Sequence, residues 1–110
     1  MFAEDAGAAR AFFRDVLEFP NVDAGDGWLI FKLPPTEIAV HPTDGPGKHE
    51  LYLMCDEIEK TLAELTAKGV TISQGASDRG WGLIASIRLP SGSDLSIYQP
   101  RHPTAYNLKG

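Results

Sequence analysis

Apolar residues recur along the chain with two different periods, one typical of helices and one typical of strands. Between Asp5 and Phe19 they appear every three or four positions, with charged residues on the other side, and this spacing predicts an amphipathic helix. Asp5 can cap its first turn, and Pro20 is expected to end it. The positions expected to face the core are Ala9, Phe12, Phe13, Val16 and Leu17.

A second helical pattern begins at Asp56. Asp56 and Glu59 have the spacing of a capping box, in which the first side chain caps the helix and the second reaches back to it. Gly69 is expected to take the left-handed conformation that ends the helix, and Glu64 and Lys68 can pair on its surface. The predicted buried stripe consists of Ile58, Leu62 and Leu65.

Short runs of alternating or β-branched residues, bounded by Gly, Pro, Asp and Ser, predict strands around the two helices. These runs are WLIFKL (28–33), EIAVH (37–41), HELYLMC (49–55), VTISQ (70–74), WGLIASIRL (81–89) and DLSIYQ (94–99). GDGW at 25–28 is predicted to be a turn, and residues 101–110 are expected to form an irregular tail.

The two halves of the chain repeat one order of elements. Asp5 aligns with Asp56, the GW at 27–28 with that at 80–81, and EIAVHP with DLSIYQP. We therefore expect one domain, residues 1–110, made of two tandem βαβββ units, with unit 1 at about 1–46 and unit 2 at about 47–100. Only four residues precede Asp5, so the first strand of unit 1 is expected to be a stub, and whether Met1 is the biological start stays open.

Composition and charge limit the classes of partner that the protein is expected to bind. The chain has 110 residues and a formal net charge of −5, and its basic residues are scattered, which disfavours nucleic acid. Cys55 is the one cysteine, so no disulfide can form within the chain. The sequence contains no long apolar span and no signal-like start, so we expect a cytoplasmic protein without a membrane partner.

The duplicated βαβββ order, the helix AFFRDVLEFP and the stretch HELYLMCDEIEKTLAELTAKGV resemble the vicinal oxygen chelate superfamily. That superfamily contains glyoxalase I, extradiol dioxygenases, fosfomycin-resistance proteins and bleomycin-resistance proteins. The resemblance covers nearly the whole chain and implies an α+β fold in which the two units form a cup-shaped mixed sheet with helices on the outside. It also implies a homodimer, because members commonly pair units across an interface.

In metal-dependent members, the resemblance implies one ligand from the opening strand and one carboxylate from the closing strand of each unit. His49, seven residues before Asp56, matches the opening position of unit 2, and the equivalent position of unit 1 would precede Met1. The two closing positions hold Ala39 and Ser96, which offer no anionic oxygen. We therefore expect no metal and no other cofactor. Were a divalent ion bound, His49 would be its ligand, and a site rearranged around His41, His49 and Glu50 would need a partner chain or a bulge.

The predicted function is metal-free binding of a small apolar or aromatic molecule in the cup, as in the bleomycin-resistance branch. The tryptophans follow glycines at matching positions and can stack on a flat ligand, although packing in the core or at an interface is the common role of such residues. The candidate ligand contacts are Trp28, Phe31, His41, His49, Trp81 and Tyr98. The alternatives are a metal-dependent lyase or dioxygenase with an incomplete site and an interaction module with no ligand, so whether the protein is an enzyme stays open.

Overall fold

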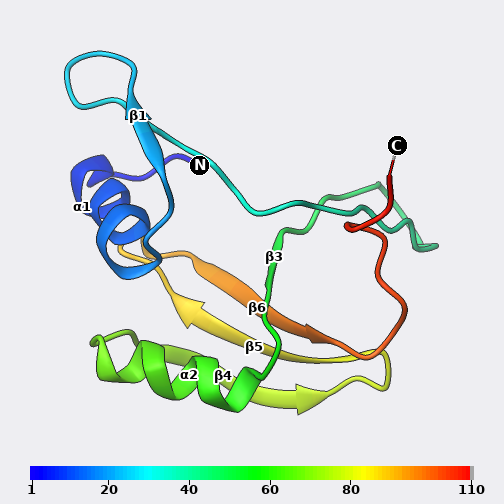
Figure 1. Cartoon of the computed structure of the whole chain (residues 1–110). Helices are drawn as coiled ribbons and strands as arrows, with labels where there is room; N and C mark the ends of the chain where they lie inside the picture. The colour runs from blue at the N-terminus through cyan, green and yellow to red at the C-terminus, as the bar shows by residue number, and fades with distance from the viewer. Residues whose placement is uncertain (110) are drawn as a thin grey trace.

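The structure is a computed structural model that describes residues 1–109 (Figure 1). It has an α+β architecture in which helices and strands from both halves are present. The helices are α1 (Ala6–Ala11), which continues into the π-helical turn η1 (Phe12–Val16), and α2 (Ile58–Ala67). The strands are β1 (Asn21–Asp23), β2 (Leu29–Phe31), β3 (Tyr52–Met54), β4 (Ile72–Asp78), β5 (Gly82–Arg88) and β6 (Asp94–Pro100).

Unit 2 has the predicted βαβββ order. Its sheet is arranged β3–β6–β5–β4, with β3 parallel to β6 and the other neighbours antiparallel. One face of this sheet packs against α2, and the predicted stripe of that helix is buried, as expected for an amphipathic helix. The core that they share contains Phe12, Ile58, Leu62, Leu65, Val70, Ala85, Ile87, Leu89, Leu95 and Ile97.

Unit 1 folds differently from the prediction after its helix. Its first strand, β1, was not predicted, and it pairs with β2 as an antiparallel hairpin around the expected turn at 25–28. The strand predicted at 37–41 is wrong for this structure, because these residues lie in no strand and form no backbone–backbone hydrogen bond with the rest of residues 1–109. In Figure 1 the chain between β2 and β3 crosses the molecule as an open segment. The tandem cup therefore stays a prediction.

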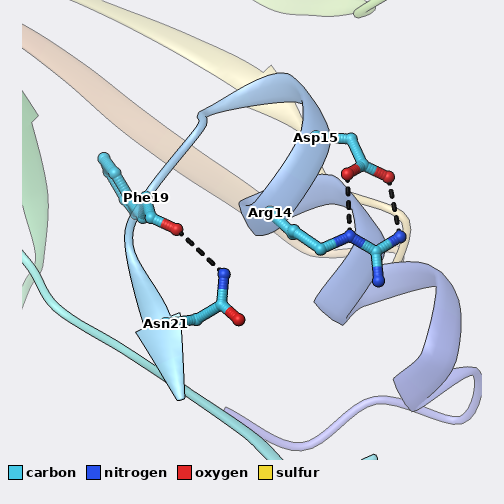
Figure 2. A network of polar contacts seen from close by, with 4 residues as sticks. All are labelled: Arg14, Asp15, Phe19 and Asn21. Carbon is cyan, nitrogen blue, oxygen red and sulfur yellow. Dashed lines mark hydrogen bonds and ion pairs between the residues drawn. The ribbon is translucent and has the colours of Figure 1, made fainter. Parts of the chain in front are cut away.

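The helix of unit 1 carries its polar residues on the exposed side. Figure 2 shows Arg14 donating two hydrogen bonds, of 2.7 and 2.8 Å, to the carboxylate of the adjacent Asp15. Where the chain turns into β1, the Asn21 side-chain amide donates to the carbonyl oxygen of Phe19 at 3.2 Å. On the apolar side Phe12 is buried, and Phe13, Val16 and Leu17 pack against the core.

The predicted cap of the first helix and the predicted end of the second are both confirmed. The Asp5 carboxylate accepts a hydrogen bond from the Ala8 amide at 2.9 Å. Gly69 has φ of 85°, in the left-handed region that glycine adopts without a steric cost. The Val70 amide then donates to the carbonyl oxygen of Leu65 at 3.0 Å, which closes the helix end.

The predicted start of α2 is wrong. Asp56 lies outside the helix, and the capping residue is Glu57, whose side chain makes no capping hydrogen bond. The Ile58 amide instead donates to Oε1 of Gln99 at 2.8 Å, so that a side chain from β6 satisfies the first turn. The capping oxygen thus comes from a residue 41 positions away in the sequence, which the local spacing of Asp56 and Glu59 does not indicate.

Lys68 links the two units. Its ammonium donates to the carbonyl oxygen of Val16 at 3.1 Å and lies 3.6 Å from the carboxylate of Glu18. The pairing predicted between Glu64 and Lys68 is therefore replaced by a contact between the end of α2 and the end of η1. This contact lies at the surface where the unit 1 helix, through its buried Phe12, packs against the core of unit 2.

Candidate functional site

The face of the sheet opposite α2 carries the polar and aromatic residues of unit 2. Along β6, Leu95 and Ile97 point toward α2 and the core, so the alternating residues Ser96 and Tyr98 point the other way. Residues paired across a sheet share a face, which extends this set to the neighbouring strands. The face, called the aromatic face below, is lined by Tyr52, Met54, Gly82, Ile84, Ser86, Ser96 and Tyr98.

Three rings surround Tyr98 on this face. The ring centroid of Tyr98 lies 5.5 Å from that of Trp81 and 5.8 Å from those of Tyr52 and His102. These separations are typical of favourable aromatic packing. Tyr98 is only 6% exposed, whereas Trp81 keeps 48% of its surface accessible. The four residues, called the aromatic cluster, thus combine a fixed centre with an accessible indole.

A hydrogen-bond network fixes the tautomer of His102. Its Nδ1 lies 2.7 Å from the carbonyl oxygen of Pro103, which can only accept, so Nδ1 carries the hydrogen. In the neutral imidazole Nε2 is then an acceptor, and the Tyr98 hydroxyl donates to it. Tyr98 is therefore held as a hydrogen-bond donor that points at an imidazole nitrogen.

Two carboxylates act on the tyrosines of the cluster. The Tyr52 hydroxyl donates to Oε2 of Glu50 at 3.2 Å. Burial, followed by the hydrogen bond and charge of Glu50, raises the pKa of Tyr52. Burial, followed by the negative charge of Glu37 and then the neighbouring Tyr52, raises the pKa of Tyr98. Both phenols therefore stay protonated at neutral pH and serve as hydrogen-bonding groups rather than as bases.

The structure brings together two of the six predicted ligand contacts, Trp81 and Tyr98. Phe31 lies 5.7 Å, centroid to centroid, from Phe13 and so packs against the unit 1 helix. Trp28 is exposed beside β2, and the exposed His41 and His49 both lie in the open segment between β2 and β3. Within one chain the predicted contacts therefore do not all converge.

Tyr52 and His102 were not among the predicted contacts. The strand pattern of HELYLMC was interpreted with His49 on the ligand side, but Leu53 and Cys55 pack against the core, which places Tyr52 on the aromatic face. His102 lies in the tail that was predicted to be irregular. Its position four residues after Tyr98 is the one sequence signal that could have indicated it, and that spacing is weak outside a helix.

The side chains present do not supply the carboxylate ligands that the resemblance implies for a metal-dependent member of the superfamily. Ala39 lies exposed in the open segment, and Ser96, on the aromatic face, offers a neutral hydroxyl. Among residues 1–109, no three His, Cys, Asp or Glu side chains are grouped so that they could hold a metal ion. Helices in the same described range are too short or too polar to span a bilayer.

A hollow of about 210 Å³ lies beside the aromatic cluster, since Met54 in its wall pairs across the sheet with Tyr98. It is lined by Pro34, Pro35, Met54, Cys55, Asp56, Pro100 and Tyr106. Burial raises the pKa of the Cys55 thiol, which keeps this side chain a neutral, apolar part of the wall. Another hollow, of about 310 Å³, lies at the contact between η1 and the ends of α2 and β5.

A sheet of four strands in the order β3–β6–β5–β4, backed by one helix and preceded by a second helix and a hairpin, defines an α+β protein built on a βαβββ unit. The chain belongs to the Glyoxalase/Bleomycin resistance protein/Dioxygenase superfamily, whose family model matches residues 1–97. This confirms the resemblance found in the sequence.

Solved structures share this fold. TnmS3, an antibiotic binding protein from Streptomyces sp. CB03234, is 24% identical with a TM-score of 0.66, over 89% of this chain and 88% of that chain. Lactoylglutathione lyase from Agrobacterium tumefaciens is 19% identical with a TM-score of 0.67, over 90% of this chain and 88% of that chain. UcmS2 is 20% identical with a TM-score of 0.60, over 87% of this chain and 90% of that chain. Comparison with curated proteins gives no significant match.

Proposed function

We propose that the protein binds a small, flat aromatic molecule without a metal, and that the aromatic cluster is the binding surface. The observation that carries the proposal is the half-exposed indole of Trp81 held at a fixed distance from Tyr98, with hydrogen-bonding phenols beside it. Such a surface offers stacking area together with a few oriented polar groups, which is what small-molecule sites need. TnmS3, an antibiotic binding protein, and lactoylglutathione lyase both share this fold, so the fold is compatible with binding, and the proposal rests on the aromatic cluster.

Two carboxylates beside the cluster favour a cationic ligand, and they outnumber the nearby cation Arg79, which acts on Tyr52. Glu50 contacts Tyr52, the charge of Glu37 acts on Tyr98, and the whole chain carries a formal net charge of −5. A positive ligand gains from these carboxylates and from the faces of the rings. An anionic molecule of similar shape should bind more weakly.

The test compares two aromatic dyes of opposite charge, thioflavin T as the cation and 1-anilinonaphthalene-8-sulfonate as the anion, by isothermal titration calorimetry. We expect thioflavin T to bind more tightly. Trp81→Ala should weaken binding by about 5- to 150-fold, because stacking on an aromatic side chain contributes about 1–3 kcal/mol. Phe2→Ala removes an exposed aromatic side chain outside the cluster and is the control. Affinities weaker than millimolar for both dyes would contradict the proposal.

We also propose that a homodimer completes the cup. Apolar side chains of unit 1, among them Val22, Ile38 and Val40, face water in the single chain, and burying them needs a second surface. A partner unit would bring Trp28, His41 and the other predicted contacts of unit 1 toward an aromatic cluster. Sedimentation velocity at high micromolar concentration should give a dimer that Ile38→Asp dissociates. Leu108→Asp, at another exposed apolar position, is the control, and a monomeric wild-type protein would contradict this proposal.

The alternative of a metal-dependent lyase or dioxygenase has its own test. Purified protein is incubated separately with nickel, zinc, manganese and iron, desalted, and measured by elemental mass spectrometry. Near-stoichiometric retention that His49→Ala abolishes would favour the alternative over metal-free binding.

A further inference from the structure

The first residues of the C-terminal tail lie against the aromatic cluster. The Arg101 amide donates to the carbonyl oxygen of Trp81 at 2.9 Å, and the Arg101 guanidinium donates to the carboxylate of Asp78 at 2.7 Å. His102 accepts the hydrogen bond from Tyr98. Residues 101–106, called the strap, thus leave the end of β6 with His102 placed against Tyr98.

A further contact fastens the far side of the strap. The Ala105 amide donates to Oε1 of Glu37 at 2.9 Å, and the charge of Glu37 also acts on the phenol of Tyr98. Glu37 belongs to the open segment between β2 and β3, which the tail approaches in Figure 1. The strap is therefore fastened at Arg101, His102 and Ala105. Its His102 covers part of Tyr98, whose ring also packs against the other members of the aromatic cluster.

The strap buries few of its own side chains. Its residues are exposed or half-exposed, and both side chains of the Arg101–Asp78 ion pair are about half exposed, at 46% and 57%. Exposed ion pairs contribute little to stability, and segments that bury little apolar surface open locally at low cost. The cluster beneath, in contrast, is anchored in the sheet. This contrast between a loosely held cover and a fixed surface is typical of a segment that opens.

We propose that the strap is a lid over the ligand site and that His102 occupies a subsite of it. The inference rests on the proposed function. In the closed state the Tyr98 hydroxyl donates to Nε2 of His102. A ligand that carries a hydrogen-bond acceptor, such as a carbonyl oxygen or a ring nitrogen, next to its aromatic ring replaces that nitrogen once the strap opens. The ligand class is therefore a flat cation, and an acceptor at its edge adds the hydrogen bond from Tyr98. Thioflavin T, whose ring nitrogen is methylated, tests access to the site without this contact.

The first experiment needs no ligand. Amide hydrogen exchange, followed by NMR, is measured at Arg101 and Ala105 in the free protein. We expect both amides to exchange more slowly than that of Lys109, and at least about threefold faster in His102→Ala than in the wild type. The control is Arg88→Ala, which removes an exposed ion pair away from the strap, between Arg88 Nε and Asp94 Oδ1 at 2.6 Å. Unprotected amides in the wild type, or no change in His102→Ala, would overturn the closed strap.

The second experiment measures access to the site. Thioflavin T is mixed with the wild type, with His102→Ala and with a chain that stops after Pro100, and association is followed by stopped-flow fluorescence. We expect the association rate constant to rise about tenfold in both variants, because binding that must wait for an opening is slowed. Equal rate constants in all three proteins would overturn the lid.

The two experiments separate the two proposals. If thioflavin T binds none of the three proteins, the proposed function and the role as a lid both fail, even where the exchange data show a closed strap. If it binds all three at one rate, the proposed function stands and the lid fails. Binding to the variants with slower association in the wild type supports both. His102→Ala keeps the test decisive should the shortened chain not fold.

Discussion

Gly82 lies directly beneath the ring of Tyr98, so one added methyl group there tests the packing of the aromatic cluster. A Cβ atom on Gly82 would overlap Cε2 of Tyr98 and would lie 2.9 Å from the carbonyl oxygen of Gln99. Gly75 in β4 is the matched control, because a Cβ atom there meets nothing within 4 Å. Neither glycine has a positive φ, so alanine is compatible with the backbone at both positions.

The expected effects have opposite signs. At an unstrained, open position, Gly→Ala stabilises a protein by about 0.4–1 kcal/mol, because it reduces the conformational freedom of the unfolded chain. We expect this for Gly75→Ala. Gly82→Ala forces the ring of Tyr98 to move, and overpacking of this kind costs about 1–3 kcal/mol. The ring has little room, since Tyr52, Trp81 and His102 surround it. The two variants should therefore differ in the free energy of unfolding by about 1.4–4 kcal/mol.

The assay is urea denaturation of both variants, followed by the fluorescence of Trp81 in a Trp28→Phe background. A double-mutant cycle with Tyr98→Ala assigns the cause. With the ring removed, the penalty for Gly82→Ala should fall by at least about 1 kcal/mol, since only the contact with the Gln99 carbonyl remains. Equal stability of Gly82→Ala and Gly75→Ala, with unchanged Trp81 fluorescence, would refute the described packing.

Three further variants test other parts of the structure. The side chain of Ile87 in β5 is fully buried on the side of the sheet that faces α2, so Ile87→Ala should lower the free energy of unfolding by about 2–5 kcal/mol in urea denaturation. The control, Ile30→Ala at an exposed position, should cost less than about 1 kcal/mol. Gln99→Ala should cost about 0.5–2 kcal/mol by removing the cap of Ile58, and Gln99→Glu, which keeps an acceptor oxygen, should lose less. Because burial raises the pKa of Cys55 and the thiolate is the reactive form, Cys55 should react with a disulfide reagent at neutral pH more slowly than free cysteine; a faster reaction would contradict its burial.

Unit 2 could be predicted from the sequence because its patterns are satisfied within the unit. The helix stripe of Ile58, Leu62 and Leu65 meets the apolar positions of β5 and β6, and each strand run has a neighbour on the sheet. The start of α2 could not be predicted in this way, since the capping group of Gln99 comes from another element and no local pattern contains it. The same holds for His102, whose partner is set by the path of the tail.

The segment 37–41 shows where a strand pattern is insufficient. Its aligned counterpart in unit 2 forms β6, which has β3 on one edge and β5 on the other, whereas Ile38 and Val40 remain 87% and 90% exposed. The two sequences have the same alternation, so the difference lies in the neighbours: residues 1–4 of unit 1 form no strand that could flank the segment as β3 flanks β6. A strand without a neighbour leaves its backbone groups to water and buries no apolar face. The radius of gyration, 15.2 Å against about 13 Å for a compact chain of this length, agrees with this open segment. In the proposed homodimer the missing neighbour would come from the partner, and the pattern of residues 37–41 would then be that of a real strand.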